Sequence, residues 1–165
     1  MLEELFPLSQ QLMHFQQKAY IRYFLGQHPN FHRLVVFTGQ RRVGKSTMMV
    51  QYLLMQADLY SEQILYVPCD HVRVQPYTIS DIAEAFSLVG GKIICFDEIH
   101  KYSNWSQELK SIYDTFPNLQ VLATGCCALS IHQGAYDLSR RVLAYTMFGM
   151  SLREYLEMYY QITLP

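Results

Sequence analysis

Eight residues in the first third of the chain constrain its fold more than any other feature. The segment Gly39–Ser46 has glycines at its first and sixth positions and ends in Lys45 and Ser46. It follows the apolar run 34–37 and opens a helical pattern that continues to about Ala57. A glycine-containing turn between a buried strand and a helix, with this spacing, is the pattern of a phosphate-binding loop. A chance match in an ordinary turn is disfavoured because the flanking strand and helix are both predicted.

Each fixed position of this loop has a chemical role. Gly39 and Gly44 permit backbone angles that turn successive N–H groups toward phosphate oxygens, and the following helix points its positive end at the same anion. We expect Lys45 to reach the β- and γ-phosphates of a nucleotide and the Ser46 hydroxyl to bind Mg²⁺. Arg41 and Arg42, at variable positions of the loop, could touch phosphate, although solvated loop arginines are favoured. The predicted nucleotide-binding residues are Gly39, Gln40, Arg41, Arg42, Val43, Gly44, Lys45, Ser46 and Thr47.

Strand-like and helix-like segments alternate along the chain. Apolar runs predict strands at 34–37, 64–67, 93–96, 119–123 and 142–147. Helical spacing predicts helices at about 5–26, 45–57, 78–89, 104–116 and 151–160. Thr78 or Ser80 could cap the third helix, and Asn104 with Gln107 resembles a capping box. The alternation predicts an α/β fold, a three-layer α/β/α sandwich around a mainly parallel five-stranded sheet. We expect a single domain over residues 1–165, with its core at about 33–148.

Composition narrows the class of protein. Half of the residues are hydrophobic and 16% are charged, which is typical of a folded α/β domain and not of a disordered chain. The 13 basic and 14 acidic residues give no basic excess of the kind that nucleic-acid binders show. Glu3 and Glu4 are atypical of a secretory signal, and the uncharged stretch 115–136 is interrupted by polar residues. We therefore expect no membrane segment and a cytoplasmic protein.

Four cysteines are present, and none forms a C-x-x-C pair. Cys69 and Cys95 lie in apolar runs and are predicted to be small core residues. Cys126 and Cys127 are adjacent, which is poor geometry for a disulfide framework or a zinc site. This usage favours a reducing compartment.

A second chemical signal follows the apolar run 93–96, which ends in Asp97 and Glu98. In a phosphate-loop fold, a carboxylate at the end of such a strand lies near the metal, so we assign Asp97 to Mg²⁺. Glu98 would activate a water for attack on the γ-phosphate, which favours hydrolysis over transfer to a small-molecule acceptor. A solvated acidic turn is the alternative. His100 could sense the nucleotide or make a structural hydrogen bond.

Several motifs together resemble one family. They are the loop 39–46, the run 97–102 with Trp105, Thr124–Gly125 followed by Ala128–Leu129, and the stretches 137–141 and 151–156. The combination is similar to the prokaryotic AAA+-like P-loop ATPases of the AAA_14 type, over about residues 10–160. Members of that family often continue into a winged-helix-like region and a C-terminal DUF4143 region. The resemblance therefore implies that this chain is a fragment of a longer protein or the product of a truncated gene.

The resemblance also implies roles for particular residues. It places the acidic strand beside the phosphate-loop strand and a polar sensor at the end of the fourth strand, where Thr124 offers a hydroxyl. Cys126 and Cys127 stand where relatives carry serines, and cysteine is the weaker donor. One of Arg140 and Arg141 would act as an arginine finger. A helix-end arginine that pairs with Asp137 or faces solvent is the alternative. The predicted catalytic residues are Lys45, Glu98, Thr124, Arg140 and Arg141, and the predicted metal ligands are Ser46 and Asp97.

The leading functional hypothesis is a domain that binds ATP with Mg²⁺ and hydrolyses it. ATP is favoured over GTP because the sequence has no N-K-x-D motif for reading guanine. The alternative is a nucleotide-gated interaction module with little turnover, whose partner would be a protein or, by analogy only, DNA. A small-molecule kinase is a third hypothesis, which Glu98 disfavours.

Overall fold

A five-stranded sheet forms the centre of the computed structural model, which describes residues 1–126, 138 and 140–164. The strand order is β2-β3-β4-β1-β5, and every neighbouring pair is parallel. The strands are β1 (Leu34–Thr38), β2 (Ile64–Pro68), β3 (Ile93–Asp97), β4 (Gln120–Gly125) and β5 (Leu143–Thr146). Strands β1 to β4 are nearly continuous apolar runs because both of their faces are buried. The predicted α/β class and mainly parallel sheet are confirmed.

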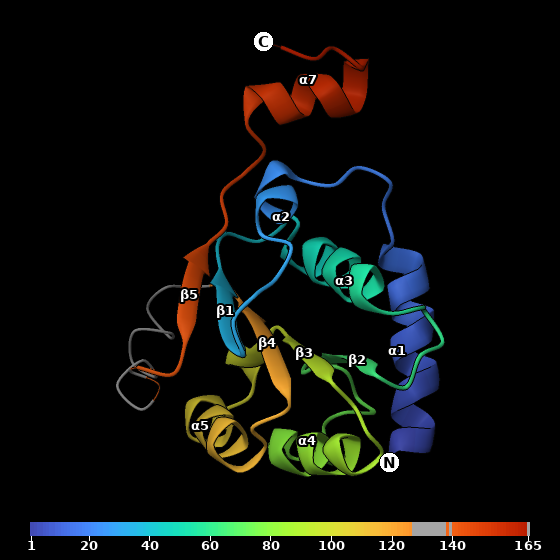
Figure 1. The fold of residues 1–165 in the computed structure, drawn as a ribbon, viewed down its shortest axis with the longest axis vertical. Helices are drawn as coiled ribbons and strands as arrows, with labels where there is room; N and C mark the ends of the chain where they lie inside the picture. The colour runs from blue at the N-terminus through green and yellow to red at the C-terminus, as the bar shows by residue number, and fades with distance from the viewer. Residues whose placement is uncertain (127–137, 139, 165) are drawn as a thin grey trace.

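Helices cover both faces of the sheet (Figure 1). One face packs on α4 (Ile79–Leu88) and α5 (Trp105–Thr115), and the other on α3 (Lys45–Gln56) and the short α2 (Tyr23–Gln27). The remaining helices are α1 (Leu2–Gln16), the 3-10 turn η1 (Ile99–Lys101) and α7 (Leu152–Tyr160). No helix among the described residues is both long enough and apolar enough to cross a membrane.

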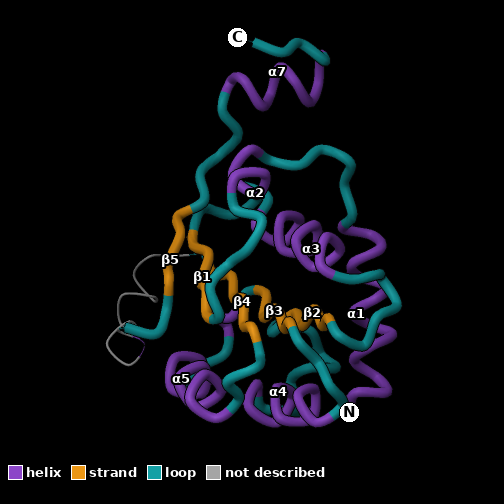
Figure 2. Tube along the Cα trace, viewed as in Figure 1, coloured by secondary structure: helices purple, strands orange, loops and turns teal. Residues whose placement is uncertain are grey.

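Helix α1 covers the β2 edge of the sheet and supplies side chains to both hydrophobic clusters (Figure 2). The backbone N–H of Tyr66 in β2 donates to the Ser9 hydroxyl of α1 at 2.9 Å, which satisfies a donor on the open side of that strand. Cys69 and Cys95 are buried, and burial raises the pKa of both thiols, so the prediction that they are core residues is confirmed.

The single helix predicted at about 5–26 is wrong. Helix α1 ends at Gln16, the backbone is extended at Gln17 (ψ 126°) and again at Arg22 (ψ 145°), and α2 begins at Tyr23. Apolar spacing continues through the break, but the side-chain amide of Gln51 in α3 donates to the carbonyls of Lys18 and Tyr20 at 2.9 and 2.7 Å. These tertiary hydrogen bonds stabilise the extended path in place of helical ones.

Two local expectations are also resolved. Thr78 is the cap of α4, because its hydroxyl accepts from the Asp81 N–H at 3.0 Å. The capping box at Asn104 is wrong: Asn104 precedes α5, but its side chain makes no cap hydrogen bond. Its ψ of 19° departs from the extended conformation that a capping side chain needs.

The acidic strand does not lie beside the phosphate-loop strand, contrary to the implied arrangement. Strand β4 lies between them, pairing with β1 on one side and with β3 on the other. The end of β4 therefore lies between the ends of β1 and β3, where Thr124 is in register with Phe37 of β1 and hydrogen-bonds to Asp97 and Glu98.

Candidate functional site

The loop between β1 and α3 has the backbone conformation that its glycines predict. Gly39 has φ 146° and Gly44 has φ 93°, and both values lie in the region that favours glycine. A Cβ atom on residue 39 would lie 2.2 Å from the carbonyl oxygen of Met147, just beyond β5. Arg42 also has a positive φ, 66°, without being a glycine. The loop is therefore a tight left-handed turn held against the end of β5.

Lys45 is the first residue of α3 and is only 4% exposed. Its ammonium donates to the carbonyl oxygens of Gly39 and Gln40, at 3.0 and 2.7 Å. A buried cation that is held inside a turn is well placed to meet a phosphate group. Arg41 and Arg42 are exposed, so the expectation that they are solvated is confirmed.

Asp97 ends β3 and is 5% exposed. One carboxylate oxygen accepts from the Tyr66 hydroxyl and the other from the Thr124 hydroxyl. Burial and the adjacent Asp97 carboxylate raise the pKa of Tyr66, so this phenol stays protonated and remains a donor. The Thr124 oxygen also accepts from the Glu98 N–H at 3.0 Å. Thr124 thus connects the two neighbouring acidic residues.

The Tyr66 hydroxyl gives a stability prediction. We expect Tyr66→Phe to lower the free energy of unfolding by about 1.5–3 kcal/mol, because a buried carboxylate loses a hydrogen-bond donor. The matched control is Tyr52→Phe, which removes a buried hydroxyl that bonds only neutral groups, on Gln120 and the Phe31 backbone. It should cost about 1 kcal/mol. Urea unfolding measures both, and equal losses would contradict a special role for Tyr66.

Glu98 follows with φ 54°, an uncommon conformation for a residue with a side chain. One carboxylate oxygen lies 3.5 Å from His100 Nε2 and 3.5 Å from Cys126 Sγ. The Cys126 N–H donates to His100 Nδ1 at 3.3 Å, so in the neutral ring the proton is on Nε2 and faces Glu98. The sequence did not show that His100 and Cys126 both contact Glu98.

A cavity of about 250 Å³ joins the two halves of the candidate site. Its walls bring Glu98 together with residues of the loop and the first turn of α3. The lining residues are Arg42, Gly44, Lys45, Ser46, Thr47 and Glu98. A polar cavity that has a buried cation on one side and a carboxylate on the other fits a phosphate chain and an attacking water.

Comparison with known proteins agrees with this geometry. The family described as AAA domain, AAA_14, matches residues 31–156, which include both halves of the site. The chain is a member of the AAA_14 family. This membership makes it an AAA-type P-loop domain, whose ligand class is a nucleotide.

Individual relatives of this AAA_14 domain are distant or longer. Protein MJ1637 of Methanocaldococcus jannaschii is 31% identical over 131 residues, covering 74% of this chain but 27% of that protein. The domain thus spans about a quarter of that relative's length. The crystal structure of Saccharomyces cerevisiae RIF2 has a TM-score of 0.53 at 9% identity, covering 98% of this chain and 70% of that one. The Walker-type ATPase PABY2304 of Pyrococcus abyssi has a TM-score of 0.49 at 13% identity, covering 86% and 57%. The RIF2 likeness concerns the fold alone.

A second cavity of about 270 Å³ lies beside the phosphate loop of the AAA_14 domain. One wall is the extended segment that contains Lys18, Tyr20 and Arg22, which the sequence had placed inside a helix. The opposite walls come from the loop, α3 and the C-terminal segment, namely Arg42, Val43, Gly44, Thr47, Met48, Gln51, Gly149, Met150 and Met158. Sequence reasoning missed this cavity because it depends on the break between α1 and α2.

The two candidate arginine fingers of the AAA_14 domain have different surroundings. The Arg141 guanidinium pairs with the Asp114 carboxylate at the end of α5, at 2.9 and 3.2 Å. Arg140 is exposed and has φ 72°. The proposed alternative partner Asp137 and the second cysteine, Cys127, lie outside the described residues. A role for either arginine at a nucleotide stays a prediction.

Proposed function

We propose that this AAA_14 domain binds ATP with Mg²⁺ and hydrolyses it to ADP and phosphate. The observation that carries the proposal is the shared cavity, in which Lys45 and Ser46 of the loop face the same space as Glu98. A loop built only to hold phosphate needs no carboxylate on the opposite wall. A carboxylate beside the terminal phosphate supports the activation of water.

Ser46 and Asp97 offer oxygen ligands of the kinds that bind magnesium ions in proteins. Ser46 offers a hydroxyl at the first turn of α3, and Asp97 offers a carboxylate that two hydroxyl donors hold in place. Oxygen ligands of these types are the ones Mg²⁺ prefers. When bound, the ion would neutralise charge on the β- and γ-phosphates.

In the proposed reaction Glu98 takes a proton from a water molecule while the oxygen of that water forms a bond to the γ-phosphorus. The bond from that phosphorus to the β–γ bridging oxygen breaks, which leaves ADP and phosphate. Lys45 would hold the β- and γ-phosphates, since its ammonium points into the loop. Thr124 positions Glu98 through the hydrogen bond to its N–H.

The cavity of about 270 Å³ is the proposed site of the base. It adjoins the loop at Gly44 and Thr47, and Met48, Met150 and Met158 give it an apolar surface on which a purine would pack.

The test of the proposed function is calorimetric titration with ATP and GTP, with and without Mg²⁺, together with measured phosphate release. We expect ATP to bind in the micromolar range or tighter and release to require Mg²⁺. Failure of both nucleotides to bind would refute the proposal.

A second candidate function is a nucleotide-gated interaction module with little turnover. The contacts of Glu98 favour it, because the Cys126 thiol and the His100 ring both engage the carboxylate that would activate water. The partner would be a protein or, by fold analogy, DNA. Tight ATP binding without phosphate release, in this chain and in a longer parent protein, would support this function over hydrolysis.

A further inference from the structure

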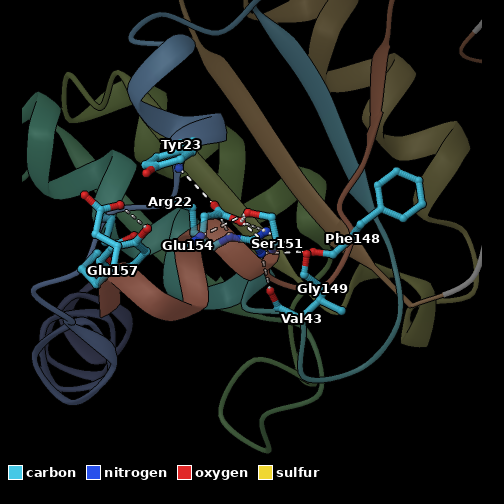
Figure 3. Close-up of polar contacts among 10 residues, drawn as sticks. Arg22, Tyr23, Val43, Phe148, Gly149, Ser151, Glu154 and Glu157 are labelled. Atoms are coloured by element: carbon cyan, nitrogen blue, oxygen red, sulfur yellow. Dashed lines mark hydrogen bonds and ion pairs between the residues drawn. The ribbon is translucent and has the colours of Figure 1, made fainter. Parts of the chain in front are cut away.

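The guanidinium of Arg22 connects three separate parts of the domain (Figure 3). Arg22 lies just before α2, at the end of the extended segment. Its Nε and Nη2 atoms donate to the two carboxylate oxygens of Glu154 in α7, at 2.9 and 3.0 Å. Its Nη1 donates to the carbonyl of Val43, within the phosphate-binding loop, at 3.1 Å. Carbonyls of Phe148 and Gly149, in the segment between β5 and α7, accept at 3.0 Å each.

These contacts use every donor that a guanidinium has. Its five N–H groups match the five hydrogen bonds in a planar, forked arrangement that a lysine could not reproduce. The side chains of Arg22 and Glu154 are 15% and 6% exposed. Bidentate pairing of this kind, shielded from water, is strong and geometrically specific.

Glu154 is held from its own side as well. Its carboxylate accepts from the Ser151 N–H, the Ser151 hydroxyl and the Tyr23 N–H. The Glu154 N–H donates in turn to the Ser151 hydroxyl oxygen, which completes a capping box at the start of α7. Burial alone would raise the pKa of Glu154, but Arg22 and the Ser151 donors outweigh burial and lower it to about 2. The carboxylate is therefore ionised throughout the neutral range.

The contacts that attach α7 to the body are mainly polar: besides the Arg22 cluster, Glu157 accepts from the Tyr20 hydroxyl at 3.1 Å. Among the nine described residues of α7, Glu154 is the only buried one, and Leu152, Met158, Tyr159 and Tyr160 are all 40% exposed or more. The helix projects beyond the sheet (Figure 1). A helix attached mainly by polar contacts, with little buried surface, can dock and undock as a unit, unlike one that is packed into a core.

From this arrangement we propose that Arg22 is a positioning residue for the phosphate-binding loop. Through it, the Arg22–Glu154 ion pair couples the docking of α7 to the affinity for nucleotide. With α7 docked, Glu154 fixes the guanidinium that holds the Val43 carbonyl and with it the loop. Linkage then requires the reverse effect: a nucleotide that prefers the ordered loop must favour docked α7. The inference rests on the proposed nucleotide-binding function and adds a regulatory contact outside its chemistry.

The test compares Glu154→Gln and Arg22→Gln with the unaltered chain in two measurements. Calorimetry gives the affinity for ATP with Mg²⁺, and hydrogen exchange gives the protection of the α7 amides with and without nucleotide. We expect each variant to weaken affinity about tenfold and the double variant to be no weaker than the worse single, since coupling energies commonly change affinity 5–150-fold. Nucleotide should slow α7 exchange in the unaltered chain and not in the variants. Arg22→Lys keeps the positive charge but loses the forked donors, so its affinity for ATP should lie between those of the unaltered chain and Arg22→Gln. It replaces Arg22→Gln in the test if that variant does not fold.

The matched control is Glu84→Gln, which makes the same chemical change at an exposed carboxylate of α4, away from α7 and the phosphate loop. It should leave affinity within twofold. Faster α7 exchange with unchanged affinity in Glu154→Gln would overturn the coupling and leave only a structural pair. If the unaltered chain binds no nucleotide, the proposed function fails and the coupling with it. The two failures differ because one is read on the unaltered chain and the other on the variants.

Discussion

Lys45→Ala is expected to abolish measurable nucleotide binding. The ammonium of Lys45 is nearly buried within the loop, where it donates to the carbonyls of Gly39 and Gln40. A bound phosphate chain would be its stronger, charged partner. Two charge-assisted hydrogen bonds to phosphate contribute about 3–6 kcal/mol together. Their loss corresponds to a weakening of roughly 100-fold to 20,000-fold. Calorimetric titration with ATP and Mg²⁺ measures it.

Lys92→Ala is the control for the Lys45 prediction. Lys92 is an exposed lysine just before β3, at the opposite end of the strands from the phosphate loop, so its removal changes the net charge equally and should leave affinity unchanged. Thermal unfolding of both variants separates lost binding from lost folding. Retained micromolar binding by a folded Lys45→Ala protein would remove the loop from the proposed site.

Glu98→Gln is expected to keep nucleotide binding and lose turnover. The amide preserves the size of the side chain but cannot take a proton from water, and general-base catalysis commonly contributes 10²–10⁴-fold. We therefore expect phosphate release at saturating ATP to fall at least about 100-fold while affinity changes little. Release is followed by a phosphate assay, and affinity by calorimetry on the same preparation.

The control for Glu98 is Glu108→Gln. Glu108 is a carboxylate of α5 that bonds the Tyr102 hydroxyl and the Ser80 N–H, so it tests the same chemical change elsewhere in the domain. Its turnover should match that of the unaltered chain. Undiminished phosphate release from Glu98→Gln would show that another group activates water, or that the released phosphate comes from a contaminant.

The phosphate loop could be predicted because its requirements are local. Two glycines, a lysine and a hydroxyl residue occur within eight positions, between a strand and a helix whose patterns are continuous. The strands could be predicted for the same reason, since both faces of each inner strand are buried and the run of apolar residues is unbroken. The family resemblance, drawn from several such runs, is confirmed over residues 31–156.

The features that could not be predicted from the sequence depend on contacts between residues that are far apart along the chain. The break after Gln16 is stabilised by Gln51, and nothing in the apolar spacing of the first segment reports that amide. The order of the strands places β4 between β1 and β3, which local pattern cannot specify. Arg22 and Glu154 are 132 positions apart, and each alone reads as an ordinary surface charge. Non-local hydrogen bonds, and not propensity, decided each of these features.

The close contact between Met147, just beyond β5, and the start of the phosphate loop has a mechanical consequence. The Met147 N–H donates to the Thr38 carbonyl at 2.7 Å, and its own carbonyl fills the space beside Gly39. Strand β5 pairs in parallel with β1, so a force that pulled α7 away along the strand direction would load this pair in shear. The load would pass first through the Arg22 cluster and then into the backbone at the start of the loop. Tension applied to α7 would therefore act on the backbone of the phosphate-binding loop before it acted on the hydrophobic core.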